Sequence, residues 1–313
     1  MDDNRIDMPQ SDEIKFKRAS ESLKNGDLDS AYQIFNDLYI NNPSVEVTLM
    51  YFRVLYELEY VEEGIELAES HPDIFYNGDT FMHDYIRLLI KANQFIKAEA
   101  MIGRAEKIPV EEIEDHHFVQ LKNALEKHRC QYKKVRKAAE ETIIKQLYSI
   151  ADATPIEQMN ILSESTSFSN PQITEAYKQI LVNPFASEIT KTMAINYLLE
   201  KEEDATVSIN WFGENRQLAL ENIDKIDDNQ TIKSLTHTLQ DKLASNPSLY
   251  QLIQQELTVH MMLIYPYINE VVKDKEKWLE FYLNQYDPNY ESDSVHENSE
   301  MAQWFKRLSN PIE

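Results

Sequence analysis

Small residues recur along the N-terminal third of the chain at intervals of 33 and 34 positions, at Ala31, Gly64 and Ala98. Each follows an apolar residue by three positions; these apolar residues are Leu28, Val61 and Phe95. A period of this length is typical of arrays of paired helices, because one helical hairpin cannot bury both of its faces without stacking on a neighbour. A small residue early in the second helix lets the two helices of a hairpin approach closely. The spacing therefore predicts three stacked helical hairpins over residues 11–110.

The first of these units, KNGDLDSAYQIFNDLYINNP (residues 24–43), resembles the tetratricopeptide repeat (TPR) family. The residues that match the family pattern are Gly26, Leu28, Ala31, Phe35 and Pro43. The second unit keeps Val61 and Gly64. The third keeps Phe95, Ala98, Ile102 and Ala105, with Pro109 one position early. The chain departs from the family in its first helices. One position of the first helix usually holds a small residue in the family. The three units of this chain have Ala19, Phe52 and Ile86 at that position. We therefore expect the second and third units to pack differently at that point.

The TPR resemblance implies a right-handed superhelix, and it covers about a third of the chain. It also implies a concave face, lined by the first helix of each unit, that receives peptides. The stretch TMAINYLLEKEEDATVSINWFGENRQLAL (residues 192–220) is similar to uncharacterised TPR proteins of low-GC Gram-positive bacteria. That second resemblance implies a cytoplasmic, partner-binding protein without known chemistry.

The remaining chain is expected to be helical apart from one small β-hairpin. Residues 1–10 are polar and are predicted to be disordered. Residues 111–153 lack glycine and proline after Pro109, so we expect one long helix, or two with a break near Lys127, that caps the array. Its apolar stripe is formed by Leu121, Ala124, Leu125, Tyr132, Val135, Ala139 and Ile143.

Residues 154–229 are predicted to form helical pairs plus a β-hairpin near 206–220. Thr154-Pro155, Asn170-Pro171 and Asn183-Pro184 each join an N-cap residue to a proline suited to the first helical turn. These signals predict helices at about 155–165, 171–182 and 187–201, which loosely resemble HEAT pairs. Val207, Ile209 and Trp211 alternate with polar residues, as strands do, and we expect the turn at Gly213 to Asn215. Residues 230–313 are predicted to form a C-terminal helical region. The predicted fold class is therefore all-α, a TPR-like superhelix followed by a HEAT-like region with one hairpin.

Charge and composition narrow the classes of function. The formal net charge of −23 repels nucleic acids and anionic membranes. The single cysteine, Cys130, cannot form an internal disulfide and indicates a reducing compartment. No stretch is apolar enough to span a bilayer, so we expect a cytoplasmic protein.

No catalytic motif is present, and we expect neither an enzyme nor a cofactor. His116 and His117 are adjacent, and on a helix they would point about 100° apart, which does not suit one metal ion. Glu256 and His260 lie four apart and are interpreted as polar packing or surface residues. Trp211, Trp278 and Trp304 are interpreted as core or hairpin-packing residues.

The repeat register places three rows of residues on the predicted concave face. The rows are Ser20, Arg53 and Arg87; Lys24, Glu57 and Lys91; and Phe16, Leu49 and His83. Arginine binds carboxylates through two parallel hydrogen bonds, so Arg53, Arg87 and Lys91 favour an acidic peptide or chain terminus as ligand. An ordinary solvated face with intrachain salt bridges is the alternative interpretation.

A second candidate surface is the basic strip KHRCQYKKVRK, residues 127–137, whose main cations are Arg129, Lys133, Lys134 and Lys137. It is interpreted as a docking surface for phosphates or an acidic partner, or as a solvated helix face. No nucleic-acid recognition motif accompanies it.

The leading functional hypothesis is a non-catalytic adaptor or scaffold. The alternative is a peptide-sensing regulator without its own DNA-binding domain. An enzyme with an unrecognised site near the hairpin is the third hypothesis.

Overall fold

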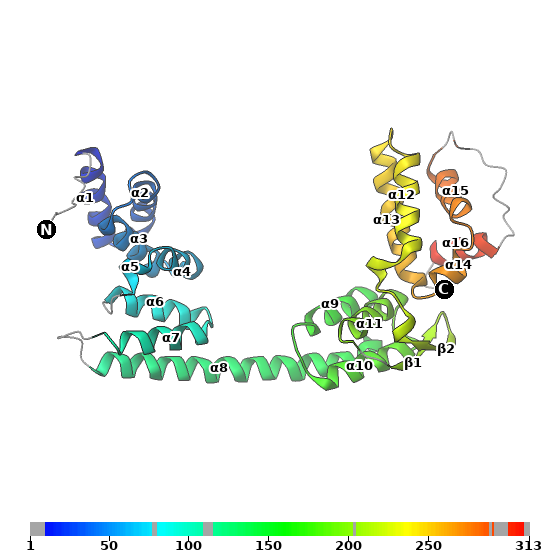
Figure 1. Ribbon diagram of the computed structural model, residues 1–313, viewed down its shortest axis with the longest axis horizontal. Coiled ribbons are helices and arrows are strands. Elements are labelled where there is room, and N and C mark those ends of the chain that lie inside the picture. The colour runs from blue at the N-terminus through cyan, green and yellow to red at the C-terminus, as the bar shows by residue number, and fades with distance from the viewer. Residues whose placement is uncertain are drawn as a thin grey trace. The chain divides into compact units, whose positions relative to one another are not determined.

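The structure is a computed structural model that describes residues 10–76, 80–108, 115–202, 205–287, 290 and 300–309. The described residues are helical except for a single two-stranded antiparallel sheet and the connecting turns (Figure 1). The chain divides into two compact units, Met1–Lys137 and Ala138–Glu313. The predicted fold class, helical hairpins followed by a helical region with one small β-hairpin, is confirmed. The expected disorder of residues 1–10 falls almost wholly outside the described residues.

The N-terminal unit is built from helical hairpins. Its helices are α1 (Gln10–Lys24), α2 (Leu28–Asn41), α3 (Val45–Glu57), α4 (Val61–Ser70), α5 (Pro72–Phe75), α6 (Thr80–Lys91) and α7 (Phe95–Ala105). The second helices of the three hairpins, α2, α4 and α7, begin at Leu28, Val61 and Phe95, the apolar residues that define the sequence period. The repeat spacing therefore fixed the register of the array correctly.

The three hairpins share one backbone turn, although only one of them has a glycine there. Gly26, Glu59 and Asn93 occupy equivalent positions and have φ angles of 79°, 59° and 59°. In each turn the next residue donates its N–H to a carbonyl five positions upstream at 2.9 Å; the pairs are Asp27–Ser22, Tyr60–Leu55 and Gln94–Leu89. This is the Schellman pattern that ends a helix in the left-handed region.

The small residues of the period lie at the helix contacts, as expected. Ala31 and Ala98 are fully buried. A Cβ atom added at Gly64 would lie 2.6 Å from Leu88 Cδ1 and 3.9 Å from Phe52 Cε2. Phe52, which departs from the TPR pattern, is fully buried, and its ring lies 4.6 Å from that of Phe75 on α5. The absence of a side chain at Gly64 therefore leaves room for Leu88 of the third unit, while Phe52 lies at ordinary contact distance from the same point.

Alanine substitutions at two glycines are expected to change the free energy of unfolding in opposite directions. At both Gly26 and Gly103 an added Cβ would meet no atom within 4 Å, so the substitution acts through the backbone alone. We expect Gly26→Ala to lower the free energy of unfolding by about 1 kcal/mol, because an L-residue resists a left-handed conformation. Gly103 lies inside α7, so Gly103→Ala should raise the free energy of unfolding by up to about 1 kcal/mol through helix propensity. Urea unfolding followed by circular dichroism measures both, and equal signs would contradict the assignment of the turn.

Helix α8 (Asp115–Tyr148) is one continuous helix, without a break near Lys127. Leu121 and Leu125 are buried in the core of the N-terminal unit, whereas Ile143 is buried in the core of the C-terminal unit. Tyr132 and Val135, between these segments, are exposed. The predicted stripe is therefore buried only toward its two ends, because each unit supplies partners for one end of the helix.

The first helices of the C-terminal unit confirm two of the three proline-based starts, whereas Asn183-Pro184 lies in a turn and α11 begins after Ser187. They are α9 (Pro155–Ser165), α10 (Pro171–Val182) and α11 (Glu188–Glu200). Thr154 caps α9 through its hydroxyl group, and the Glu157 carboxylate accepts the Thr154 backbone N–H at 2.8 Å, completing a capping box. Asn170 caps α10 and Ser187 caps α11 through their side chains.

The β-hairpin consists of β1 (Thr206–Trp211) and β2 (Glu214–Ala219), with Trp211 paired to Glu214. The connecting residues are therefore Phe212 and Gly213, and the predicted turn at Gly213 to Asn215 is wrong by one residue. Both connecting residues have positive φ angles, 48° and 85°, as tight two-residue hairpins require. Glycine takes the second turn position, which leaves Asn215 to pair within the sheet.

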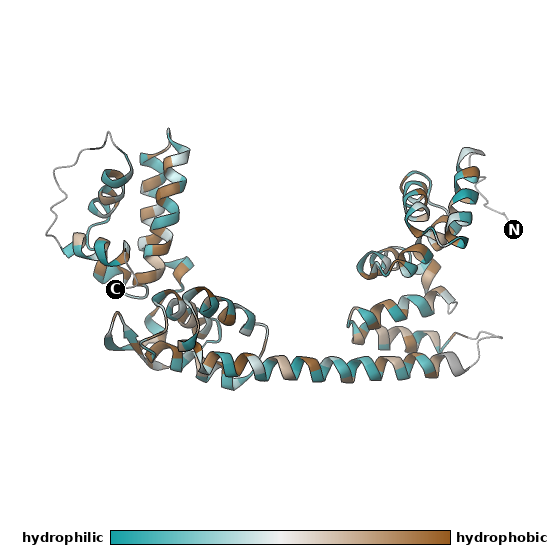
Figure 2. Ribbon diagram, turned by 180° about the vertical axis from the view of Figure 1, so that it is seen from behind, coloured by the Kyte–Doolittle hydropathy of each residue, from teal (hydrophilic) through white to brown (hydrophobic). Residues whose placement is uncertain are grey.

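The rest of the unit is helical. The elements are α12 (Gln230–Lys242), α13 (Pro247–Ile264), α14 (Ile268–Val271), α15 (Lys275–Tyr286) and α16 (Glu300–Ser309), with short 3-10 helices at Ile150–Asp152, Leu220–Asn222 and Ile226–Asp228. Apolar and hydrophilic residues are interspersed along the helices, as in amphipathic helices (Figure 2). Trp211 and Trp278 are buried and Trp304 packs against Trp211, which confirms their interpretation as packing residues.

His260 is a buried histidine within this unit. Its Nδ1 atom lies 2.7 Å from the Tyr282 hydroxyl, and its Nε2 atom lies 3.7 Å from Glu256 Oε1. These contacts confirm that Glu256 and His260 serve polar packing. Burial lowers the pKa of His260 below its ordinary value of 6.5, and the nearby Glu256 carboxylate partly opposes this shift.

The lowered pKa of His260 predicts a pH-dependent stability. Below about pH 6.5 the unfolded chain binds a proton at this position that the folded chain resists, so folding loses free energy as the pH falls. We expect the stability advantage of the wild type over His260→Gln to be complete above pH 7 and to shrink as the pH falls through 6.5. Denaturant titrations at several pH values measure it. The control is His237→Gln, because His237 is exposed; an equal pH effect in both variants would contradict the prediction.

Candidate functional site

The first helices of the three hairpins carry the predicted binding rows. The row of Ser20, Arg53 and Arg87 contains a charge cluster. Arg53 on α3 and Arg87 on α6 both contact Asp84. Arg87 Nη1 lies 2.8 Å from Asp84 Oδ1, and Arg53 Nη1 lies 3.5 Å from Asp84 Oδ2. Arg53 also pairs with Glu57 at 2.8 Å. The structure therefore brings the two arginines to opposite oxygens of one carboxylate.

Burial divides this cluster into a fixed centre and a solvent-facing edge. The Asp84 side chain is 3% exposed, whereas those of Arg53 and Arg87 are 42% and 48% exposed. A buried carboxylate requires charged hydrogen-bond partners, and the two guanidinium groups supply them. Each guanidinium has five N–H donors, and these contacts occupy only part of them. Donors therefore remain at the surface for a further carboxylate.

The other row residues differ in accessibility. Lys24 is exposed at the end of α1, and Ser20 is partly buried. Lys91 is exposed and pairs with Glu59 at 2.8 Å. Phe16 is partly buried, with its ring 5.6 Å from that of Phe35.

His83 lies in the same row as Phe16 but is buried. Its ring lies 5.3 Å from that of Phe118 on α8, in an edge-to-face arrangement. His83 therefore contributes packing at this point, where the sequence register suggested an exposed contact.

Asp84 is the residue of this cluster that the sequence reasoning missed. Its spacing of three from Arg87 is a recognisable helical ion-pair signal. The repeat register alone does not reveal it, because the equivalent positions hold Lys17 and Met50.

The basic strip on α8 is partly neutralised. Arg129 pairs with Glu99 at 2.8 Å and Glu126 at 2.9 Å, and its guanidinium lies 5.9 Å from the centre of the Phe95 ring. Lys133, Lys134 and Lys137 are exposed and line a shallow hollow of about 300 Å³ beside the exposed, free Cys130. Arg129 thus ties α8 to α7, while the lysines face solvent.

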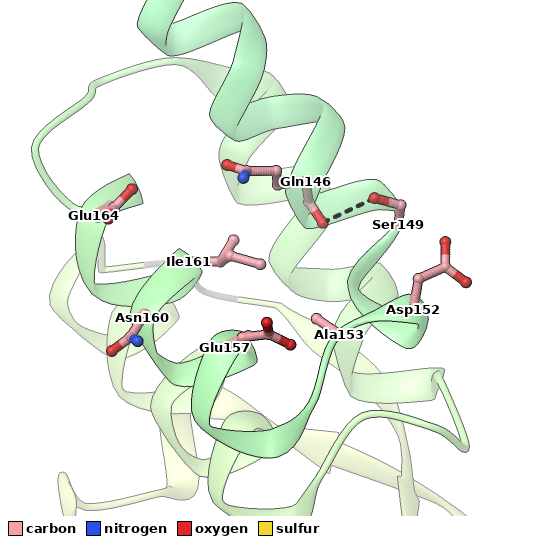
Figure 3. A pocket seen from close by; sticks show the side chains of 8 residues that line it. All are labelled: Gln146, Ser149, Asp152, Ala153, Glu157, Asn160, Ile161 and Glu164. Carbon is pink, nitrogen blue, oxygen red and sulfur yellow. Dashed lines mark hydrogen bonds between the residues drawn. The ribbon is translucent and has the colours of Figure 1, made fainter.

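An acidic hollow of about 420 Å³ lies between the end of α8 and α9 (Figure 3). Its carboxylates belong to Asp152, Glu157 and Glu164. Glu157 accepts the backbone N–H and the hydroxyl of Thr154, and these bonds lower its pKa. The Glu157 carboxylate therefore has a structural role, because it belongs to the capping box at the start of α9.

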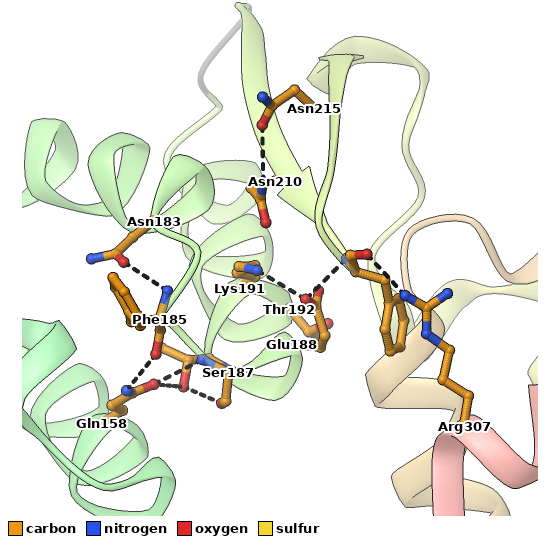
Figure 4. A network of polar contacts seen from close by, with 12 residues as sticks. Gln158, Asn183, Phe185, Ser187, Glu188, Lys191, Thr192, Asn210, Asn215 and Arg307 are labelled. Carbon is orange, nitrogen blue, oxygen red and sulfur yellow. Dashed lines mark hydrogen bonds and ion pairs between the residues drawn. The ribbon is translucent and has the colours of Figure 1, made fainter. Parts of the chain in front are cut away.

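A polar network holds the tip of the β-hairpin (Figure 4). The buried Lys191 pairs with Glu188 at 2.9 Å, and Glu188 accepts the Phe212 backbone N–H at 3.1 Å. Arg307 on α16 donates to the Phe212 carbonyl at 2.8 Å, and its guanidinium lies 4.4 Å from the centre of the Phe212 ring. The charged residues near the hairpin thus restrain Phe212 in its left-handed conformation.

Within the described part of the chain, no three histidine, cysteine or acidic side chains are grouped as a metal site requires. The structure does not describe the side chains of His116 and His117. Among the described helices, none combines the length and apolar character needed to cross a bilayer.

Stacked helical hairpins with a shared Schellman turn define a helical-repeat class of protein. A TPR repeat-containing protein of Bacillus subtilis (strain 168), YsoA, is 30% identical to this chain over 116 residues. The similar region spans 37% of this chain and 35% of YsoA, about a third of each. No protein-family model matches the chain, and no solved structure matches it. The similarity to YsoA supports a TPR-like repeat protein.

Proposed function

We propose that the protein is a non-catalytic adaptor or scaffold whose N-terminal repeats bind an acidic peptide or the acidic segment of a partner protein. The binding surface is the first-helix face, defined as Phe16, Ser20 and Lys24 on α1, Arg53 on α3, and Arg87 and Lys91 on α6. The similarity of the chain to a TPR repeat-containing protein over 116 residues supports a role in protein interaction. Cytoplasmic action fits the single free cysteine.

The observation that carries the proposal is the Arg53–Asp84–Arg87 cluster. Asp84 holds both guanidinium groups before any ligand arrives, so their side chains lose little conformational entropy on binding. The exposed N–H groups then donate to a carboxylate in a planar, bidentate geometry. Asp84 and Glu57 offset the charge of the two arginines, so an acidic ligand would be held by the exposed N–H donors and not by a local excess of positive charge.

The test is capture of partners from a lysate of the source cells, followed by mass spectrometry. The variants are Arg53→Glu/Arg87→Glu and the milder Arg53→Gln/Arg87→Gln, which keeps the buried Asp84 free of an added negative neighbour. The matched control is Lys15→Glu/Lys97→Glu, because both lysines are exposed, belong to the same unit and lie outside the first-helix face. Circular dichroism confirms that each protein folds.

We expect a specific partner to be retained by the wild type and the control and lost by both arginine variants. Its binding should also weaken as salt rises, because exposed charge pairs are screened beyond about 10 Å at 0.1 M salt. An identical partner set in all proteins would overturn the first-helix face as the site. A bound cofactor in the purified protein, with turnover of a substrate, would overturn the non-catalytic role.

A further inference from the structure

The C-terminal unit exposes a group of apolar side chains around the end of α10. Phe185 is 74% exposed, Tyr148 is 55% exposed and Val182 is 38% exposed. Single exposed apolar residues are normal, but a cluster around a hollow marks an interaction surface. We name this surface the Phe185 patch and define it as Tyr148, Gln179, Val182, Asn183, Pro184 and Phe185.

Hydrogen bonds hold the backbone of Phe185, although its side chain is exposed. Its backbone N–H donates to Asn183 Oδ1 at 2.9 Å, and its carbonyl accepts from Gln158 Nε2 at 3.2 Å (Figure 4). Gln158 is buried, and its Oε1 atom accepts the Ser187 N–H and the Thr190 hydroxyl, both at 2.9 Å. An aromatic side chain on a fixed backbone has only two side-chain torsions to order, so it loses little entropy when a partner buries it, which suits it to be an interface anchor.

A hollow of about 530 Å³ adjoins the segment that carries Phe185. It is lined by Tyr148, Glu175, Gln179, Val182 and Asn183. Asn183 joins the two features, because it lines the hollow and also holds the Phe185 backbone. A cavity of about 150 Å³ already admits a benzene ring, so the hollow is large enough for one phenylalanine side chain.

The charges of the patch permit contact between two copies of the chain. Each copy has a net charge of −23, so most faces of two copies repel each other. Among the residues lining the hollow, the single acidic one is Glu175, which pairs with Lys178 at 3.0 Å. A second copy therefore meets a nearly neutral surface here.

We propose that the Phe185 patch is a homodimer interface in which Phe185 of each copy enters the hollow of the other. A projecting side chain and a receptive hollow on one patch satisfy two-fold symmetry, because each copy then supplies both halves of the contact. The dimer forms through the C-terminal unit and does not depend on peptide binding by the repeats.

Sedimentation velocity over a concentration series up to about 100 µM tests the proposal. We expect wild-type dimers and an at least ~100-fold weaker association for Phe185→Ser, since each dimer loses two anchor contacts. The matched control is Ile96→Ser, whose side chain is 85% exposed in the N-terminal unit, and it should dimerise like the wild type. Val182→Glu, which blocks the hollow, should abolish self-association. Circular dichroism confirms that each variant folds.

Mixing the two defective variants gives the sharpest outcome. Phe185→Ser keeps an intact hollow and Val182→Glu keeps an intact phenylalanine, so an equimolar mixture should form heterodimers with one restored contact. A monomeric wild type at the highest concentration would overturn the proposal, as would wild-type dimers that tolerate Phe185→Ser. A monomeric wild type that binds a different protein through Phe185 would assign the patch to a heterologous partner instead.

Discussion

Phe305→Ala is expected to lower the free energy of unfolding of the C-terminal unit by about 3–5 kcal/mol, the usual cost of removing a buried phenylalanine ring. Phe305 on α16 is 6% exposed. Its ring centre lies 4.6 Å from that of Trp278, 4.7 Å from that of Phe281 and 4.9 Å from that of Tyr282. Truncation would leave a cavity bordered by three aromatic rings, two of which, Trp278 and Tyr282, are fully buried and cannot easily move to fill it.

The three tryptophans of the chain lie in the C-terminal unit, so tryptophan fluorescence reports the unfolding of that unit. Guanidinium titrations of Phe305→Ala should show an earlier fluorescence transition. The control is Leu252→Ala, whose side chain on α13 is 47% exposed and should change the stability by no more than about 0.5 kcal/mol. A shift in Phe305→Ala no larger than in Leu252→Ala would show that α16 does not complete this core.

The first helices of the C-terminal unit were predictable from the sequence, because an N-cap residue followed by proline starts a helix through contacts between near neighbours in the chain. Thr154-Pro155 and Asn170-Pro171 start α9 and α10 where the sequence places them. The hairpin was also recognisable, since alternation of apolar and polar residues identifies a strand. Its turn was misplaced by one residue because Phe212 adopts a conformation that a large side chain usually avoids. Glu188 and Arg307, from distant parts of the chain, restrain Phe212 there.

Helix α8 shows a different limit of sequence reasoning. The periodic stripe predicted a long helix correctly but did not reveal which of its residues find partners. Leu121 and Ile143 belong to separate cores, while Val135 between them is exposed. Periodicity indicates which residues share a face, whereas burial depends on tertiary contacts that no local pattern contains.

The candidate site was predictable in position but not in its electrostatics. The repeat register placed Arg53 and Arg87 in one row, and the structure shows that a shared carboxylate holds both. The register could not show that Asp84 is buried between them, because equivalent positions in the other units hold different residues. It also could not show that Phe118, beyond the repeats, covers His83.

Phe52→Ala is expected to lower the free energy of unfolding of the N-terminal unit by about 3–5 kcal/mol. Phe52 is fully buried against Phe75. The N-terminal unit contains no tryptophan, so circular dichroism should show an earlier loss of helix while tryptophan fluorescence stays unchanged. The control is Ile96→Ala, whose side chain is 85% exposed and should have little effect on stability.

A double-mutant cycle with Gly64 tests why the second repeat departs from the TPR pattern. Gly64→Ala alone should be destabilising by about 1–3 kcal/mol, because the added methyl group would lie 2.6 Å from Leu88 Cδ1. In the Phe52→Ala background the same methyl group meets a vacated space that also lets Leu88 move, since Phe52 borders the same point at 3.9 Å. We therefore expect the double variant to be more stable than the sum of the single effects by about 1–2 kcal/mol. Strict additivity would show that Phe52 and Gly64 vary independently. The predicted coupling would show that the large residue on α3 and the glycine on α4 are one compensated pair.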